Sequence, residues 1–183
     1  MKKDIGSVLA LYPTPAVVVG AMVDGKPTWT LVAHVGVIGH DRILVSLAKP
    51  HYINAGIKET GALSVNVVDE GILEQADCAG CVSGAKTDKS ELFAWSAGAD
   101  DAPLADEAKL TMECTVEDVY DTKNFDNFIC SIGHTYADEE ILGENGKIDY
   151  DAFKPVLFEM PGYTYLKTGE TIAKCASFGK ARA

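Results

Sequence analysis

Ala16-Val17-Val18-Val19-Gly20-Ala21-Met22-Val23 is a run of apolar and β-branched residues that ends in Asp24-Gly25. Valine is enriched in strands, and Asp-Gly after such a run is a strong signal for a tight hairpin turn. Residues 28–38, which are rich in Thr, Val and Trp, follow as the return strand. The sequence therefore predicts a β-hairpin, and with it an antiparallel sheet, in the first part of the chain.

Further strands are predicted outward from this hairpin, over residues 43–47, 63–67, 110–117 and 128–135. Apolar and polar residues alternate over 110–117, which is the pattern of a strand with two different faces. We expect Leu110 and Cys114 on the apolar face and Thr111 and Glu113 on the polar face.

The helices are predicted to be few and short. Residues 52–60 form one helix, ended by Gly61 as a typical C-terminal cap. Residues 72–93 contain loop and a second short helix, and residues 138–142 form one helical turn. Because the strands do not alternate with long helices, a doubly wound nucleotide-binding fold is disfavoured. The pattern predicts a mostly antiparallel barrel with appended helices.

The composition fits one globular domain. The chain has 183 residues, of which 47% are hydrophobic and 23% charged, and roughly 100–200 residues per domain is usual. The net charge of −11 argues against partners such as nucleic acid or an anionic membrane surface. We find neither a signal-peptide core nor an apolar stretch of the about 20 residues that a membrane helix needs, so we expect a cytoplasmic protein.

Five cysteines cannot all pair within one chain, which favours free thiols in a reducing compartment. Cys78 and Cys81 have the C-x-x-C spacing, but no second Cys or His pair completes a tetrahedral metal site. Incidental thiols are the simplest interpretation, and a redox or regulatory disulfide is the alternative. His34 and His134 each stand alone in a strand, so no metal site is predicted.

Gly80-Cys81-Val82-Ser83-Gly84-Ala85-Lys86-Thr87-Asp88-Lys89 is the segment most suggestive of ligand binding. It is not a nucleotide-triphosphate loop of the Walker type, because Ala85 separates Gly84 from Lys86. Its small residues, hydroxyl and two lysines can surround an anion, although a solvated loop gives the same composition. A second candidate anion site is Ser46 to Tyr52, where a strand leads into a helix, and ordinary turn chemistry is the alternative there.

The order of these segments resembles the flavin reductase-like family, the FMN-binding split-barrel proteins that include flavoredoxins. The resemblance runs from about Tyr12 to about Tyr165, and its most specific part is the Ser-Gly-x-Lys-x-Asp-Lys loop that ends at Lys89. It implies a six-stranded antiparallel split β-barrel of the Greek-key type that forms a homodimer. The flavin reductase-like domain is then expected to be single, over residues 1–183, with its core at about 12–165.

The resemblance also implies which residues hold FMN. Lys89 would pair with the phosphate, helped by Ser46, Lys49 and His51, and Ser83, Gly84 and Lys86 would shape the loop. Thr30 and His34 would lie near the isoalloxazine ring, and His134 near its polar edge or near the phosphate. No catalytic residue is assigned, because the flavin itself carries out the redox chemistry.

The expected function is that of an FMN-binding oxidoreductase that passes a hydride from NAD(P)H to flavin and electrons on to an acceptor. The alternative is a flavoredoxin-like electron carrier, reduced by a partner protein without direct NAD(P)H activity. A third interpretation is a colourless small-molecule-binding barrel. The sequence leaves open the choice of NADH or NADPH, the acceptor, and whether FMN is a tight cofactor or an exchanging substrate.

Overall fold

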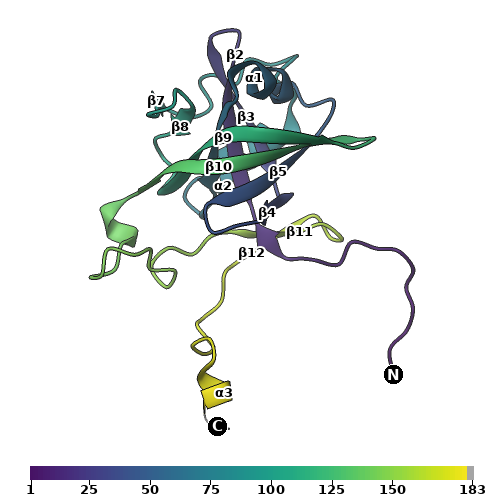
Figure 1. Cartoon of the computed structure of the whole chain (residues 1–183), viewed down its shortest axis with the longest axis vertical. Helices are drawn as coiled ribbons and strands as arrows, with labels where there is room; N and C mark the ends of the chain where they lie inside the picture. The colour runs from purple at the N-terminus through teal and green to yellow at the C-terminus, as the bar shows by residue number, and fades with distance from the viewer. Residues whose placement is uncertain (181–183) are drawn as a thin grey trace.

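The computed structural model describes residues 1–180, and its centre is a seven-stranded antiparallel sheet in the order β3-β2-β6-β9-β10-β5-β4 (Figure 1). Its strands in chain order are β2 Val17–Val23, β3 Lys26–Val32, β4 Val35–Val37, β5 Arg42–Ala48, β6 Ala62–Val67, β9 Leu110–Asp121 and β10 Phe125–Ala137. Two small sheets accompany it, one made of β1 Thr14–Pro15, β11 Leu157–Glu159 and β12 Thr164–Leu166, the other of β7 Trp95–Ala97 and β8 Pro103–Ala105. The helices are α1 Ile53–Thr60, α2 Leu73–Cys81, the 3-10 turn η1 Glu139–Ile141 and α3 Ser177–Lys180.

The order of the strands requires the sheet to curl. β3 and β4 lie at its opposite edges, yet only Ala33 and His34 separate them in the chain. The three peptide steps from Val32 to Val35 span at most about 11 Å, so the two edges must approach each other at this segment. β3 and β4 together are the return strand predicted over residues 28–38, bent near its middle. Counted in this way the barrel has six antiparallel strands, as predicted.

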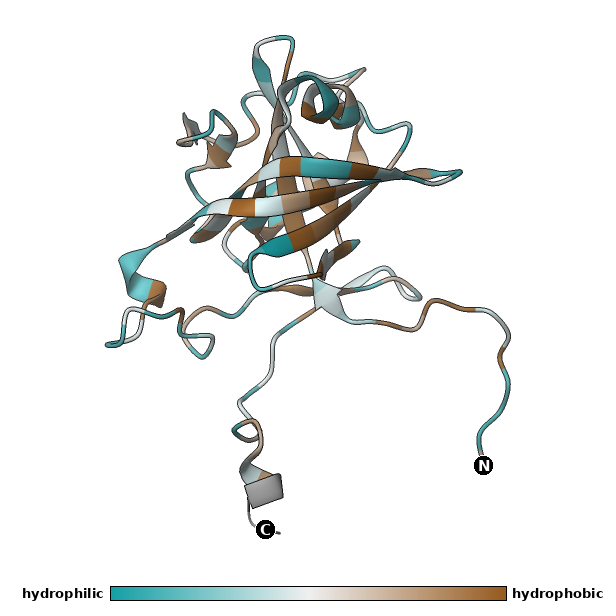
Figure 2. Ribbon diagram, viewed as in Figure 1, coloured by the Kyte–Doolittle hydropathy of each residue, from teal (hydrophilic) through white to brown (hydrophobic). Residues whose placement is uncertain are grey.

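β2 is buried on both faces, which explains its unbroken apolar sequence. Val17, Val19 and Ala21 belong to the core inside the curled sheet, which α1 helps to close. Val18 faces the opposite way, into a second core with Trp29 and the apolar side of α2. A strand covered on both sides reads as a continuous apolar run, and Figure 2 shows the brown stripes of the central strands beside the paler and teal loops.

The polar face predicted for β9 carries Thr111 and Glu113 as expected, but both residues are buried there. Thr111 and Glu113 are 2% and 0% exposed, because the segment before and within β8 covers this half of the strand. The Glu113 carboxylate accepts hydrogen bonds from the backbone amides of Ala99 and Asp100, and Thr111 donates its hydroxyl to Asn66. The alternation therefore assigns apolar and polar residues of β9 to the correct faces, but it does not show that the polar face is covered.

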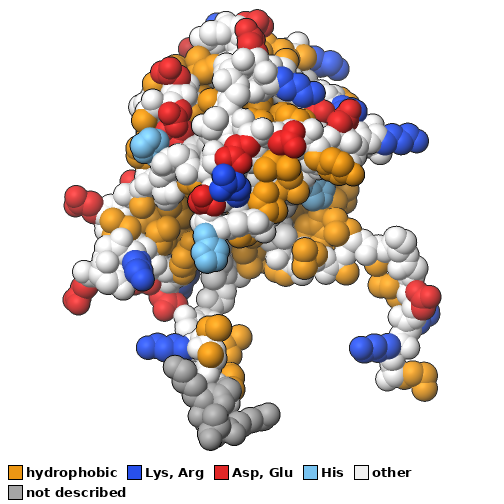
Figure 3. Space-filling view, viewed as in Figure 1, with side chains coloured by type: hydrophobic (Ala, Val, Ile, Leu, Met, Phe, Trp, Pro, Cys, Tyr) orange, Lys and Arg blue, Asp and Glu red, His pale blue; other side chains and the backbone are white. Residues whose placement is uncertain are grey.

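Both ends of the chain leave the barrel as extended arms (Figure 1). Apolar side chains on these arms are exposed, among them Leu11 at 80% and Ile172 at 97%, and Figure 3 shows such orange side chains away from the main body. Within residues 1–180, no helix combines the length and the apolar character that crossing a bilayer requires.

Candidate functional site

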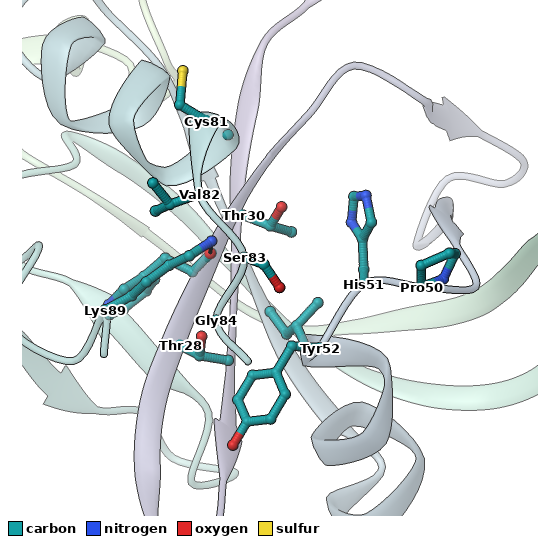
Figure 4. Close-up of a pocket in the computed structure, with 13 residues that line it drawn as sticks. Thr28, Thr30, Pro50, His51, Tyr52, Cys81, Val82, Ser83, Gly84 and Lys89 are labelled. Atoms are coloured by element: carbon teal, nitrogen blue, oxygen red, sulfur yellow. Dashed lines mark hydrogen bonds between the residues drawn. The ribbon is translucent and has the colours of Figure 1, made fainter. Parts of the chain in front are cut away.

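A cavity of about 310 Å³ lies between β3, the start of α1 and the loop that follows α2 (Figure 4). We call it the lysine cavity. Side chains alternate along β3, so Trp29 points into the core while Thr28 and Thr30 face the cavity. The lining comes from three separate segments, namely Thr28, Trp29 and Thr30; Pro50, His51, Tyr52 and Ile53; and Gly80, Cys81, Val82, Ser83, Gly84 and Lys89.

Lys89 is the buried charge of this cavity. Only 7% of the residue is exposed, and its Nζ donates to the carbonyl oxygens of Trp29 at 2.9 Å and of Ala79 at 2.7 Å. Within residues 1–180, no Asp or Glu forms an ion pair with it. Burial lowers the pKa of Lys89, because removing an ammonium from water disfavours its charged form. An ammonium has three N–H groups, so one is left for a ligand in the cavity.

Further hydrogen-bond donors surround this ammonium. The hydroxyls of Thr28, Thr30 and Ser83 lie at the lining (Figure 4). α1 begins at the cavity after Tyr52, and no side chain caps its first turn. The amide groups at the start of a helix carry a partial positive charge and attract anions. The cavity therefore combines one buried cation with hydroxyl and amide donors, which is the chemistry of a phosphate site.

Gly84 keeps the cavity lining closely packed. A Cβ atom at this position would lie 2.7 Å from Tyr52 Cδ1 and 3.0 Å from Thr28 Oγ1. Any larger residue would push the loop away from β3 and α1. The glycine thus lets the loop that carries Ser83 approach the threonines of β3.

A second hollow of about 300 Å³ adjoins the lysine cavity, with His51 in the lining of both. We call it the aromatic hollow, and its main side chains are Leu31, His34, Ser46, Phe125, Phe158 and Met160. Apart from His51, its polar side chains are already paired, because Tyr12 Oη and His34 Nε2 are 3.0 Å apart and Ser46 donates to Asn127 Oδ1 at 2.7 Å. Its remaining surface is apolar and suits a planar ring.

His51 stands where the two spaces meet. Desolvation by its surroundings, and secondarily the positive charge of Lys89, lower the pKa of His51. Both effects disfavour the imidazolium form. The His51 ring is therefore a neutral donor or acceptor between a positively charged cavity and an apolar one.

Comparison with known proteins now identifies the family. A family model described as the flavin reductase like domain matches residues 9–166. The chain belongs to the flavin reductase-like family. Among solved structures, the flavoredoxin from Methanosarcina acetivorans is 32% identical, with a TM-score of 0.94 and 100% of both chains covered. The flavoredoxin of Desulfovibrio vulgaris (Miyazaki F) is 31% identical, with a TM-score of 0.90, 98% of this chain and 100% of that chain covered.

More distant structures share the fold. An FMN-binding protein from Thermus thermophilus with bound 1-cyclohex-2-enone is 19% identical, has a TM-score of 0.80, and covers 95% of this chain and 99% of its own. A search among curated proteins finds no match. The family and these structures confirm the split barrel that the sequence predicts.

The structure brings together most of the residues that the family resemblance implies. Thr30, His51, Ser83, Gly84 and Lys89 line the lysine cavity, and His34 and Ser46 line the aromatic hollow. These seven form one continuous site through the shared residue His51.

Three of the expected residues line neither the lysine cavity nor the aromatic hollow. Lys86 lines an adjoining depression beside Lys26 and Asp88. This depression shares Lys89 and three other lining residues with the lysine cavity. Lys49 forms an ion pair with Asp121 at 2.5 Å. His134 stacks on Tyr136 at the far part of β10 and lines neither the lysine cavity nor the aromatic hollow. In this flavin reductase-like chain, Lys86 follows a turn in which its amide donates to the Ser83 carbonyl oxygen, and the pairing of β10 with β9 shifts register just before His134.

Sequence reasoning missed several lining residues. Thr28 could have been found, because it shares the face of β3 with Thr30 two positions later. Phe125 and Met160 gave no signal, because an apolar residue of a core and one of a ligand hollow look the same in sequence. Tyr12 is paired with a histidine 22 positions away, and only the fold reveals that contact.

Proposed function

We propose that this protein binds FMN across the lysine cavity and the aromatic hollow and works as an FMN-dependent oxidoreductase. The observation that carries the proposal is the Lys89 ammonium, which is buried beside an open cavity with only carbonyl partners. A buried charge is destabilising unless an opposite charge offsets it. A phosphate group would supply that charge and would accept hydrogen bonds from the surrounding hydroxyls and helix amides.

The residues that line the two spaces fit FMN. Lys89, Thr28, Thr30, Ser83 and the start of α1 would hold the phosphate, and the aromatic hollow would take the flat ring system. When bound, the flavin supplies the redox chemistry by accepting a hydride or electrons and passing them on. The role of the protein is to bind and orient the flavin. Phe125, Phe158 and Met160 would exclude water from the ring, while the hydrogen-bonded pair of Tyr12 and His34 would fix one polar edge of the hollow.

We propose NAD(P)H as the hydride donor, in keeping with a flavin reductase-like family. The second candidate is an electron carrier reduced by a partner protein. The observation favouring it is that, in the part of the chain that the structure describes, neither Lys nor Arg lines the aromatic hollow or its extension toward Leu9 and Leu11. A nicotinamide dinucleotide carries a pyrophosphate, which proteins usually bind with cations or helix amides. The net charge of −11 would also attract a basic redox partner.

We also propose a homodimer, the form that the family resemblance implies. The exposed apolar side chains of the two arms support it, since apolar surface of this kind is typical of interaction sites. Light scattering after gel filtration would measure the mass in solution, and a monomer at micromolar concentration would contradict this part of the proposal.

The test is a visible absorption spectrum of the protein after incubation with FMN and gel filtration, repeated without oxygen after adding NADH and then NADPH. A flavin band that bleaches with either nucleotide supports the reductase and shows its preference. A band that bleaches with dithionite but with neither nucleotide supports the carrier. If no flavin co-elutes, and equilibrium titration shows no FMN binding either, FMN binding is wrong and a barrel with another ligand remains.

A further inference from the structure

The last turn of α2 carries two exposed cysteines, of which Cys81 also lines the lysine cavity, and an anchor for Lys89. Cys78 and Cys81 are both exposed, while Ala79 between them is fully buried. The Ala79 carbonyl oxygen accepts the 2.7 Å hydrogen bond from Lys89 Nζ. Gly80 packs against β3, where an added Cβ would lie 3.0 Å from Leu31 Cβ. This turn is therefore held against the lysine cavity by the residues between the cysteines.

The two cysteines are close enough to be joined. Positions three apart in an α-helix have Cα atoms about 5 Å apart, which lies within the range of disulfides. Their Cβ atoms are about 5–6 Å apart, whereas a disulfide needs about 3.5–4.5 Å. The turn must therefore tighten by about 1 Å. α2 ends at Cys81, and Val82 is already extended, so the turn is at a helix end, where such tightening is common.

We propose that Cys78 and Cys81 form a reversible disulfide that weakens anion binding at Lys89. The oxidant is a small-molecule disulfide. The Asp77 carboxylate beside Cys81 raises the pKa of that thiol, so the Cys78 thiolate attacks first. The S–S bond of the small disulfide breaks, and one small thiol leaves with a proton. The second cysteine then attacks the mixed disulfide, and the other small thiol leaves with the second proton. The two cysteines lose two electrons in total, and the small disulfide gains them.

The coupling follows from the turn that both functions share. Tightening the turn moves the Ala79 carbonyl, so Lys89 loses one of the two acceptors that hold it at the cavity. Losing a hydrogen bond to a charged group should weaken the affinity for a phosphate ligand by about tenfold. This second part of the inference rests on the FMN-binding function proposed above.

The remaining cysteines allow a clean experiment. Cys114 and Cys130 are buried, and burial raises the pKa of each to about 12, so they react slowly with disulfides. Cys175 is exposed, and a Cys175→Ser variant of the full chain removes it. In that background the accessible thiols are Cys78 and Cys81. The additional substitution Cys78→Ser gives the matched control that cannot form the bridge.

Glutathione disulfide would be added to the Cys175→Ser protein, and maleimide-modified thiols would be counted by intact mass before and after. We expect two modified thiols before oxidation, none after it, and recovery with dithiothreitol. FMN titration should show about tenfold weaker binding in the oxidised protein and no change in the control. Stable glutathione adducts, or two thiols that still react with maleimide after oxidation, would overturn the proposed disulfide.

A second readout keeps the coupling testable without flavin. In the amide NMR spectrum of the flavin-free protein, oxidation should shift the signals of Trp29, Ala79 and Lys89, and the control should not change. A disulfide that forms without shifting these signals overturns the coupling to Lys89. If the signals shift but the reduced protein binds no FMN, the coupling stands and the proposed FMN-binding function is the part that fails.

Discussion

Lys89 Nζ donates a 2.9 Å hydrogen bond to the carbonyl oxygen of Trp29, a residue 60 positions earlier in the chain. The Trp29 side chain is itself fixed in the core, with its ring centroid 5.3 Å from that of Phe93. The charge of the lysine cavity is therefore positioned by a strand whose Trp29 side chain is fully buried. The protein places this charge before any ligand arrives, and such preorganisation favours binding.

Substitution of Lys89 distinguishes the contribution of the phosphate to flavin binding from that of the ring. In Lys89→Ala we expect FMN to bind at least about 100-fold more weakly, because a charge-assisted contact in a buried site is lost. Riboflavin lacks the phosphate, so its affinity should change by less than about threefold. Flavin fluorescence titration of FMN and of riboflavin against the original protein and Lys89→Ala measures the four dissociation constants.

Lys86→Ala is the matched control, since Lys86 lies in the same loop and lines the adjoining depression but not the lysine cavity itself. Its affinity for FMN should stay within about threefold of the original. An equal loss in both lysine variants would mean that the loop acts through its overall charge. An equal loss for FMN and riboflavin in Lys89→Ala would remove the phosphate assignment.

A substitution at Gly84 tests whether the close packing of the cavity lining is needed for FMN binding. The Cβ atom of Gly84→Ala would lie 2.7 Å from the Tyr52 ring and 3.0 Å from the Thr28 hydroxyl, so the loop must move away from both. We expect about tenfold weaker FMN binding, measured by the same titration. Gly169→Ala is the control, because nothing lies within 4 Å of a Cβ at that position, and it should bind FMN as the original does. Unchanged affinity in Gly84→Ala would show that this loop does not contact the ligand.

The barrel was predictable from sequence because its signals are local. Asp24 and Gly25 form the expected hairpin turn, both with positive φ, and Gly61 ends α1 in the left-handed conformation with its amide bonded to Ile57. Each of these needs only a few neighbouring residues. The division of 28–38 into β3 and β4 was not predictable, since it depends on the curl of the whole sheet.

The site was predictable only in part, for a similar reason. The glycine, serine and lysine of the loop after α2 form a recognisable sequence pattern, and Ser83, Gly84 and Lys89 do line the cavity. Lys49 and His134 had the right residue types at plausible positions. Whether such a side chain faces a cavity depends on contacts that the local pattern does not reveal, here that of Lys49 with the distant Asp121 and that of His134 with Tyr136. The burial of Glu113 by Ala99 and Asp100 is unpredictable for the same reason.

Gly56 tests the packing of α1 on the barrel. A Cβ atom there would lie 2.0 Å from the carbonyl oxygen of Met22, so Gly56→Ala should destabilise the fold by about 3 kcal/mol through overpacking. An exposed helical glycine replaced by alanine would instead gain up to about 1 kcal/mol. Urea unfolding followed by circular dichroism distinguishes these opposite signs. The neighbouring exposed residue provides the comparison, since Ala55→Gly should lose about 1 kcal/mol by helix propensity alone.

Asp126 should make stability depend on acid pH. Its carboxylate joins α1 to β10 by accepting hydrogen bonds from Asn54 at 2.9 Å and from Lys58 at 2.8 Å. Burial alone would raise the pKa of Asp126, but these two donors outweigh it and hold the pKa below its ordinary value of 3.8. The unfolded chain then binds the proton more readily than the folded one. The stabilisation is therefore complete above the unfolded pKa of about 3.9 and is lost as the pH falls through the lower folded value.

Asp126→Asn consequently loses about 2–3 kcal/mol of unfolding free energy at pH 7, and this difference from the original protein should shrink steadily below about pH 4. Urea unfolding at several pH values measures both curves. Asp121→Asn serves as the control, because Asp121 pairs with Lys49 at the surface, where ion pairs contribute little, and it should lose much less at every pH. A deficit in Asp126→Asn that stays constant down to pH 2.5 would mean that the contact stabilises the fold through packing and not through its charge.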